Sequence, residues 1–185
     1  FEVIYPGFRE DWGKTILQWA TSCPVRHLAC RSFQLFRCVS STLDQHMLAD
    51  MLARLSNTIS DDEGDIQTFS MEILTTLKTI IESLSTQDIM QYPQLFWTTC
   101  ACLDTIHERE FMESLDMLDK LLDKFDLANP AIVKILNDSQ PQKWDGGFAG
   151  VAELIYKGVR SSVCLGRSLR LLEKLVALPS NELTG

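Results

Sequence analysis

The sequence predicts an all-α protein built from HEAT- or armadillo-like helical repeats, an α-solenoid segment with about nine helices in antiparallel pairs. Apolar residues recur at spacings of three and four, and alternation with period two never persists. Helix pairs begin near residues 10, 42, 93 and 148, and the intervals of about 32, 51 and 55 residues bracket the roughly 40–47 residues of such repeats. Pairs stack because one pair alone cannot bury both of its apolar faces. A plain globular helical bundle is the alternative.

The first predicted pair occupies residues 10–22 and 24–39. Pro24 separates the helices, because the residue before a proline avoids the helical conformation and proline suits a first helical turn. From the first helix, the expected inward residues are Trp12, Ile16, Leu17, Trp19 and Ala20. From the second, they are Leu28, Ala29, Phe33, Leu35 and Phe36.

The second pair is predicted at 42–59 and 65–84, with Ser41 or Thr42 as the cap of its first helix. Residues 85–92 are expected to form a loop. The remaining predicted helices span 93–106, 108–125, 130–137, 148–159 and 161–178.

The longest predicted loop, 138–147, is expected to be a weak internal break in a single helical-repeat domain covering residues 1–185. It contains Trp144 and the pair Gly146-Gly147. A phosphate loop is not indicated, because no lysine follows in the required register and no strand precedes the glycines. We therefore interpret the glycines as a flexible hinge. Two roles stay open for Trp144: it either anchors the loop or is exposed for a partner.

Composition restricts the class of partner. The chain has 185 residues, is 45% hydrophobic and carries a net charge of −8. The charge is +2 over residues 1–40, −12 over 41–128 and +2 over 129–185. An acidic middle argues against nucleic acid, which needs a continuous basic track, and permits a basic protein partner.

The apolar pattern and the cysteines bear on location. No apolar run is long enough to span a membrane, and no signal peptide is evident at the start. The six cysteines lie inside helical patterns, which favours free thiols in a reducing compartment and a cytoplasmic location. Because the chain starts at Phe1 and stops after an apolar helix, we expect it to be a fragment of a much larger scaffold protein.

A zinc site at Cys23, His27 and Cys30, completed by Cys38 or His107, lacks the paired short spacings that structural zinc prefers. We instead expect His27 on a polar helix face and Cys30 against the core.

Cys100 and Cys102 project in different directions from one helix, which indicates core packing. A thiol enzyme or small hydrolase using Cys100 with His107 is a further alternative. The acidic run 61–65 suggests a calcium loop with Glu72 at position twelve, but Ile66 stands where an EF-hand needs glycine. We therefore predict no catalytic residue, no cofactor and no metal, and a chain that is not an enzyme.

The candidate partner-binding residues are cationic: Lys157, Arg160, Arg167, Arg170 and Lys174. The last three recur at i, i+3 and i+7, so they form one polar stripe whose guanidinium groups suit carboxylates or phosphates. An ordinary solvated face is the alternative.

A second candidate is the acidic face of helix 108–125, which carries Lys120 and Lys124 beside Glu113, Asp116, Asp119 and Asp123. It is expected to be exposed, or else to pack against a basic surface of a neighbouring repeat.

Five long strings cover nearly the whole chain: residues 12–37 (WGKTILQWATSCPVRHLACRSFQLFR), 43–59, 66–81, 92–127 and 176–185 (VALPSNELTG). They resemble the carboxy-terminal region of the Furry family, most closely its fungal members, the cell morphogenesis proteins.

The resemblance implies a helical-repeat scaffold without a catalytic domain. It implies partners among Ndr/LATS-class kinases, Mob coactivators and Ste20-like kinases, or other parts of the same chain. The implied process is polarised growth and cell morphogenesis, with enrichment at growth sites or the cell cortex. No individual site residue follows from it. The alternative is a purely structural capping segment of a large solenoid without an external partner.

Overall fold

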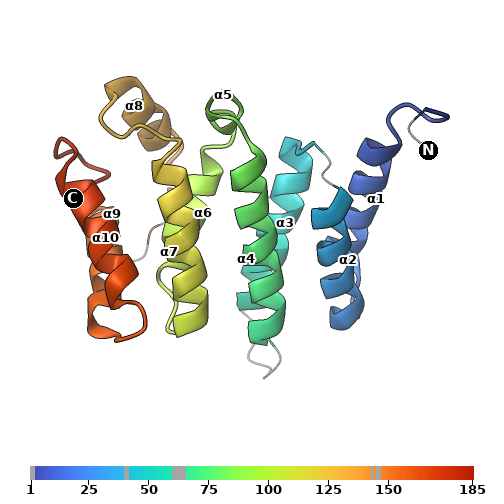
Figure 1. Cartoon of the computed structure of the whole chain (residues 1–185), viewed down its shortest axis with the longest axis horizontal. Helices are drawn as coiled ribbons and strands as arrows, with labels where there is room; N and C mark the ends of the chain where they lie inside the picture. Colours follow the sequence, from blue (N-terminus) through green and yellow to red (C-terminus); the bar gives the residue numbers. More distant parts are fainter. Residues whose placement is uncertain (1–2, 40–41, 60–65, 143, 145–146) are drawn as a thin grey trace. The chain divides into compact units, whose positions relative to one another are not determined.

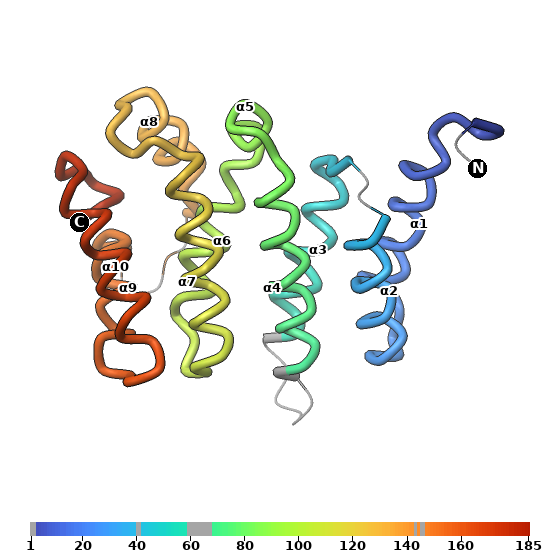
Figure 2. Tube along the Cα trace, viewed as in Figure 1, coloured from blue at the N-terminus to red at the C-terminus, as the bar shows by residue number. Residues whose placement is uncertain are grey.

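A computed structural model describes residues 3–39, 42–59, 66–142, 144 and 147–185. Within these ranges the chain forms ten α-helices and one 3₁₀ helix and contains no strand (Figure 1). Consecutive helices pack in pairs, including α1 with α2 and α6 with α7 (Figures 1 and 2). The predicted all-α fold class of paired, solenoid-type helices is confirmed, whereas the HEAT or armadillo type of the repeat stays a prediction.

The chain divides into two compact units, Phe1–Ile80 and Ile81–Gly185. The first contains α1 (Phe8–Ser22), α2 (Arg26–Val39), α3 (Gln45–Ile59) and most of α4 (Ile66–Ser83). Residues 138–147, where we expected the weak break, lie inside the second unit. The single domain stays a prediction.

The core of the first unit forms where α1 packs against α2 and α3. Its fully or nearly fully buried side chains include Leu17, Ala20, Phe33, Leu48, Met51, Ile73 and Leu77. The α3 helix begins three residues later than predicted, and its cap is Asp44, whose Oδ1 accepts a hydrogen bond of 2.8 Å from the Met47 amide. A carboxylate at this position stabilises the free amides of the first turn.

Four residues predicted to face inward are exposed instead. The exposed fractions of Trp12 and Trp19 are 48% and 60%, and those of Leu28 and Leu35 are 46% and 45%. Helix α1 buries Gly13, Ile16, Leu17 and Ala20. Both helices therefore carry two adjacent apolar stripes, and only one stripe of each packs within the unit.

The second unit contains α5 (Thr86–Ile89), α6 (Gln94–Cys102), α7 (Glu108–Leu122), α8 (Pro130–Asp138), α9 (Val151–Tyr156), η1 (Lys157–Arg160) and α10 (Leu165–Val176). Several boundaries differ from the prediction, among them the end of α6 and the start of α10, and two of the differences have a local cause. The predicted loop 85–92 contains α5, because the Ser85 side chain caps it by accepting from the Asp88 amide. The expected helix 148–159 begins only at Val151, after Gly150 with φ of 104°.

The core of the second unit lies between α6 and α7, which run side by side (Figure 2). Its buried side chains include Leu95, Phe96, Trp97, Leu115, Leu118, Leu121 and Phe125. The indole of Trp97 donates to the carbonyl of Leu136 in α8 at 2.9 Å. Trp144 packs edge-on against Trp97 and Phe148, with ring centroids 5.9 and 5.3 Å apart. The structure therefore answers the open question for Trp144: it anchors the loop.

Candidate interaction surfaces

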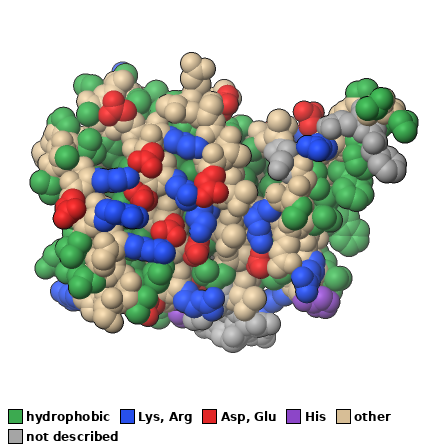
Figure 3. Space-filling view, viewed as in Figure 1, with side chains coloured by type: hydrophobic (Ala, Val, Ile, Leu, Met, Phe, Trp, Pro, Cys, Tyr) green, Lys and Arg blue, Asp and Glu red, His purple; other side chains and the backbone are tan. Residues whose placement is uncertain are grey.

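The cationic stripe of α10 faces the acidic side of α7 within the second unit. Arg167 pairs with Asp116 at 2.7 Å, Arg170 pairs with Asp119 at 3.2 Å, and Lys174 pairs with Asp119 and, at 3.0 Å, with Asp123. We call these six residues the charge ladder. Figure 3 shows Lys and Arg side chains interleaved with Asp and Glu over these two helices.

In the charge ladder, each cation of α10 lies next to at least one carboxylate of α7. The Lys174 ammonium donates hydrogen bonds to the carboxylates of Asp119 and Asp123, and these bonds raise the pKa of Lys174 above its ordinary value. The three ladder cations, which are among the five residues predicted to bind a partner, are therefore already paired inside the chain. For the acidic face, packing against a basic surface of a neighbouring repeat is one of the two expectations, and Asp116, Asp119 and Asp123 do pack against the basic side of α10.

The other two cationic candidates lie near η1. Lys157 pairs with Asp104, and both side chains are about half exposed or more. Arg160 is exposed and, among the residues that the structure describes, makes no ion pair. These two positions are the most accessible of the set to a carboxylate or phosphate from outside.

Two lysines of α7 contact the end of α4. Lys120 pairs with Glu82, which raises the pKa of the ammonium through their hydrogen bond. Lys124 donates to the carbonyls of Ile81, Glu82 and Leu84. Burial lowers the pKa of Lys124. The three carbonyls accept the hydrogen bonds of its ammonium group. These contacts cap the last turn of α4, whose carbonyls have no partners within the helix.

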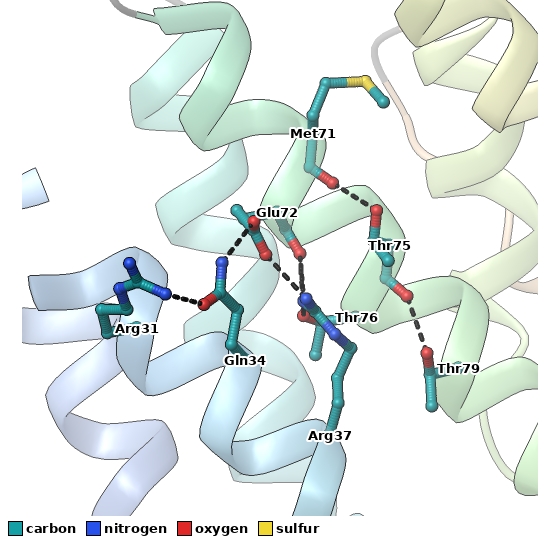
Figure 4. Close-up of polar contacts among 8 residues, drawn as sticks. All are labelled: Arg31, Gln34, Arg37, Met71, Glu72, Thr75, Thr76 and Thr79. Atoms are coloured by element: carbon teal, nitrogen blue, oxygen red, sulfur yellow. Dashed lines mark hydrogen bonds and ion pairs between the residues drawn. The ribbon is translucent and has the colours of Figure 1, made fainter. Parts of the chain in front are cut away.

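A polar network that the sequence pattern did not predict joins α2 to α4 in the first unit. The guanidinium of Arg37 pairs with Glu72 at 2.8 Å and donates to the Thr76 hydroxyl at 2.8 Å, while Gln34 donates to Glu72 at 2.8 Å (Figure 4). The side chains of Arg37 and Glu72 are each only 20% exposed. Glu72 is therefore engaged between helices, and the acidic run 61–65 lies outside the described residues.

An aromatic face covers the outside of α1. The rings of Phe8 and Trp12 lie 5.3 Å apart, and Tyr5 packs on Phe8 at 6.4 Å. The Tyr5 hydroxyl donates to Asp11 at 2.8 Å, and this bond raises the tyrosine's pKa. Figure 3 shows hydrophobic side chains gathered at the edge of the view over α1. Together with Trp19, these residues form a preorganised apolar surface, the α1 face.

A second apolar stripe lies on α10, away from the charge ladder. Leu165, Leu169 and Val176 are 37%, 45% and 86% exposed, and Leu172 between them is half-buried. Their spacing is that of one helix face. Ser168, Leu171 and Leu175, about a quarter turn around the helix from this stripe, are buried, so α10 has two adjacent faces without charge.

The environment of Cys100 and Cys102 does not suit a nucleophilic thiol. Cys100 is fully buried, and burial raises its pKa well above the ordinary range, while burial raises the pKa of Cys102 to about 12. A nucleophile needs the thiolate, which burial disfavours. His107 is exposed and occupies the N-cap position of α7. Cys100 therefore acts as a small buried hydrophobe, as its helical pattern indicates.

The residues weighed for zinc do not converge. Cys23 is buried, His27 and Cys38 are exposed, and Cys30 is intermediate. No group of three metal-ligating side chains occurs among the described residues. Among all the residues that the structure describes, no helix is long and apolar enough to cross a membrane.

The fold and its surfaces define a class: a helical protein whose packed helices are joined by a part-buried polar network in one unit and an ion-pair ladder in the other, with exposed apolar stripes on α1 and α10. Residues 93–185 match the family described as Cell morphogenesis C-terminal, and residues 2–65 match Cell morphogenesis central region. The chain therefore belongs to the fungal cell morphogenesis branch of the Furry family.

Two relatives illustrate the similarity. The chain is 46% identical over 176 residues to Cell morphogenesis protein PAG1 of Saccharomyces cerevisiae, covering 95% of the chain and 7% of that protein. It is 37% identical over 181 residues to Cell polarity protein mor2 of Schizosaccharomyces pombe, covering 98% of the chain and 8% of that protein. The chain thus spans less than a tenth of the length of either relative. No solved structure matches it at a significant level.

Proposed function

We propose that the chain is a non-catalytic scaffold segment of a cell morphogenesis protein, which docks members of an Ndr/LATS-class kinase network at sites of polarised growth. The expected partners are the kinase, its Mob coactivator, a Ste20-like kinase or other parts of the same chain. The names of PAG1 and mor2 support a role in morphogenesis and polarity. The kinase network is what the Furry resemblance implies.

The α1 face is the observation that carries the docking proposal. It presents Trp12 and Trp19 at 48% and 60% exposure, and stacking with Phe8 fixes the orientation of the Trp12 ring. Tryptophan and tyrosine dominate the binding energy of protein interfaces, since they bury large areas with few rotatable bonds. Soluble proteins seldom expose clusters of this kind without a partner.

The five cationic residues supply the electrostatic part of the proposal. A partner carboxylate has to compete with Asp116, Asp119 or Asp123 for the ladder cations, whereas Arg160 needs no such exchange. We therefore propose that Arg160 and Lys157 make the first contacts and that the ladder residues contribute less. Such contacts steer association and become weaker as salt increases.

The test is a pull-down of purified Ndr-class kinase, Mob coactivator and Ste20-like kinase with the chain. We expect retention of at least one of them, loss of retention in the double variant Trp12→Ser/Trp19→Ser, and weaker, less salt-sensitive retention in Lys157→Glu/Arg160→Glu. Ile106→Ser is the matched control, since Ile106 is 94% exposed and lies on neither surface. Equal retention of all variants would refute these surfaces.

A structural role without an external partner is the second candidate, and the apolar stripe of α10 favours it. Leu165, Leu169, Leu172 and Val176 have the spacing that packs against another helix. If this role is correct, none of the three proteins is retained, and deletion of the segment makes the full-length parent protein insoluble.

A further inference from the structure

The hairpin of α1 and α2 carries an exposed apolar face that involves both helices. Trp12 and Trp19 on α1 are 48% and 60% exposed, and Leu28 and Leu35 on α2 are 46% and 45% exposed. Each pair is seven positions apart, so each helix contributes one straight ridge. Residues 23–25 join the helices, so the two run antiparallel and their ridges lie side by side. We call these four side chains the outer hairpin face.

The outer hairpin face is turned away from α3 and α4. A residue two positions along a helix projects about 200° around the axis, which is almost the opposite direction. Lys14, two positions after Trp12, pairs at 3.9 Å with the carboxylate that caps α3. Arg37, two positions after Leu35, pairs with Glu72 of α4 at 2.8 Å (Figure 4). Contacts within the described part of the first unit therefore leave the other side of the hairpin exposed.

The outer side of the hairpin resembles its inner side in construction. On the inner side, both helices bury apolar residues where the hairpin meets the rest of the unit: Leu17, Ala20, Phe33 and Phe36. Two antiparallel helices with a ridge on each form a surface onto which other helices pack, ridge into groove. An extended peptide would instead need the edge of a sheet. The outer hairpin face therefore suits a second helix pair.

The relatives indicate where such a helix pair comes from. The chain spans 7% of PAG1 and 8% of mor2, and the hairpin lies in the part that matches the central region of the family, before the C-terminal part. Consecutive helices of a chain are mostly neighbours in space, and the connections between them are typically about 2–8 residues long. In a parent protein of that length, the segment directly before α1 can therefore reach the outer hairpin face through a short connection.

We propose that, in the full-length parent protein, the outer hairpin face packs against the helix pair that directly precedes residue 1. This inference rests on the proposed function, because it selects one of the partners named there, another part of the same chain, as the occupant of this face. Lys157 and Arg160 lie in the second unit and stay accessible to an external protein. The hairpin is then an internal repeat of the parent's helical array.

The test is photo-cross-linking in the full-length parent protein. Trp19→p-benzoylphenylalanine places a photoreactive ring of similar size on the outer hairpin face, and peptide mass spectrometry identifies what it contacts. We expect cross-links to the stretch before residue 1, within about one repeat, or roughly 40–47 residues. The matched control is Ile106→p-benzoylphenylalanine, since Ile106 is 94% exposed in the second unit, and it should give no cross-link to that stretch.

Each other occupant of the face gives a different result. Cross-links from position 19 to a kinase-network protein, to a second copy of the parent or to a distant part of its chain would overturn the inference, as would the absence of any. Mixing isotope-labelled and unlabelled parent protein separates links within one chain from links between copies. A cross-link to a kinase-network protein would support the proposed function while overturning this inference, so the two fail separately.

Leu28→Cys provides a second measurement, which decides the question if the photoreactive variant does not fold. Alkylation at position 28 should be at least ~tenfold slower in the purified parent protein than in the chain of residues 1–185, because a covered side chain reacts only when the contact opens. Ile106→Cys is the matched control and should react equally fast in both proteins. Equal rates at position 28 would refute a covered face.

Discussion

Asp119→Asn offers the sharpest test of the charge ladder, because it removes one charge and almost no volume. The Asp119 side chain is 22% exposed and pairs with both Arg170 and Lys174, which are 60% and 39% exposed. Partly exposed ion pairs each contribute about 0.2–1 kcal/mol, and the exposure of both cations favours the lower half of that range. We therefore expect the variant to lose ~1 kcal/mol of unfolding free energy.

The loss corresponds to roughly 2–4 °C in melting temperature for a protein of this size. Unfolding of the second unit is followed by the emission of Trp97, which is 3% exposed. Glu153→Gln is the control, since Glu153 is exposed on α9 and outside the ladder. In 1 M salt the Debye length falls from about 8 to about 3 Å, so the difference between variant and unaltered chain should shrink.

The pH dependence of the ladder has a definite sign. The folded pKa of Lys174 lies above its ordinary value of 10.5, so its stabilising contribution is present below that pH and is lost as the pH rises through the folded pKa. Asp119→Asn should therefore weaken the alkaline loss of stability. A variant as stable as the unaltered chain in low salt, with no coupling to Lys174→Gln in a double-mutant cycle, would refute the ladder as a stabilising contact.

Three further changes test other contacts. Arg37→Met should destabilise the first unit by about 2 kcal/mol, because it leaves the largely buried Glu72 carboxylate without a cation; an unchanged urea midpoint contradicts this. Lys124→Met should cost about 1–3 kcal/mol, since it leaves carbonyls at the end of α4 unsatisfied, and faster exchange of α4 amides is the readout. Burial holds the thiol pKa values of Cys100 and Cys102 above 9.0, so stability should fall as pH rises above 9. Cys102→Ala should flatten that fall, and an unaltered slope between pH 8 and 10 argues against it.

Much of the helical layout could be predicted from local chemistry. The α7 helix begins at Glu108 as expected, because its apolar spacing is regular and acidic residues occupy its first turn. Pro130 begins α8 as predicted, because the proline ring suits a first helical turn. Pro24 separates α1 from α2 as predicted, but α2 begins two residues later, at Arg26. The α5 helix was missed because one turn of helix is too short to show a period.

The candidate surfaces were only half predictable. Spacing placed Arg167, Arg170 and Lys174 on one face of a helix, and that face exists. Their pairing with Asp116 and Asp119 joins residues 51 and 55 positions apart, for which local spacing contains no signal. The Arg37–Glu72 contact, 35 positions apart, was missed for the same reason.

The sequence by itself determined that this chain is helical, where most helices begin, and which positions share a face. Tertiary structure decided which of two apolar stripes on α1 is buried, that Trp144 anchors a loop, and that the cations of α10 are paired with α7. The physical reason is that periodicity is a property of one helix, whereas burial and ion pairing depend on which second helix comes to lie against it.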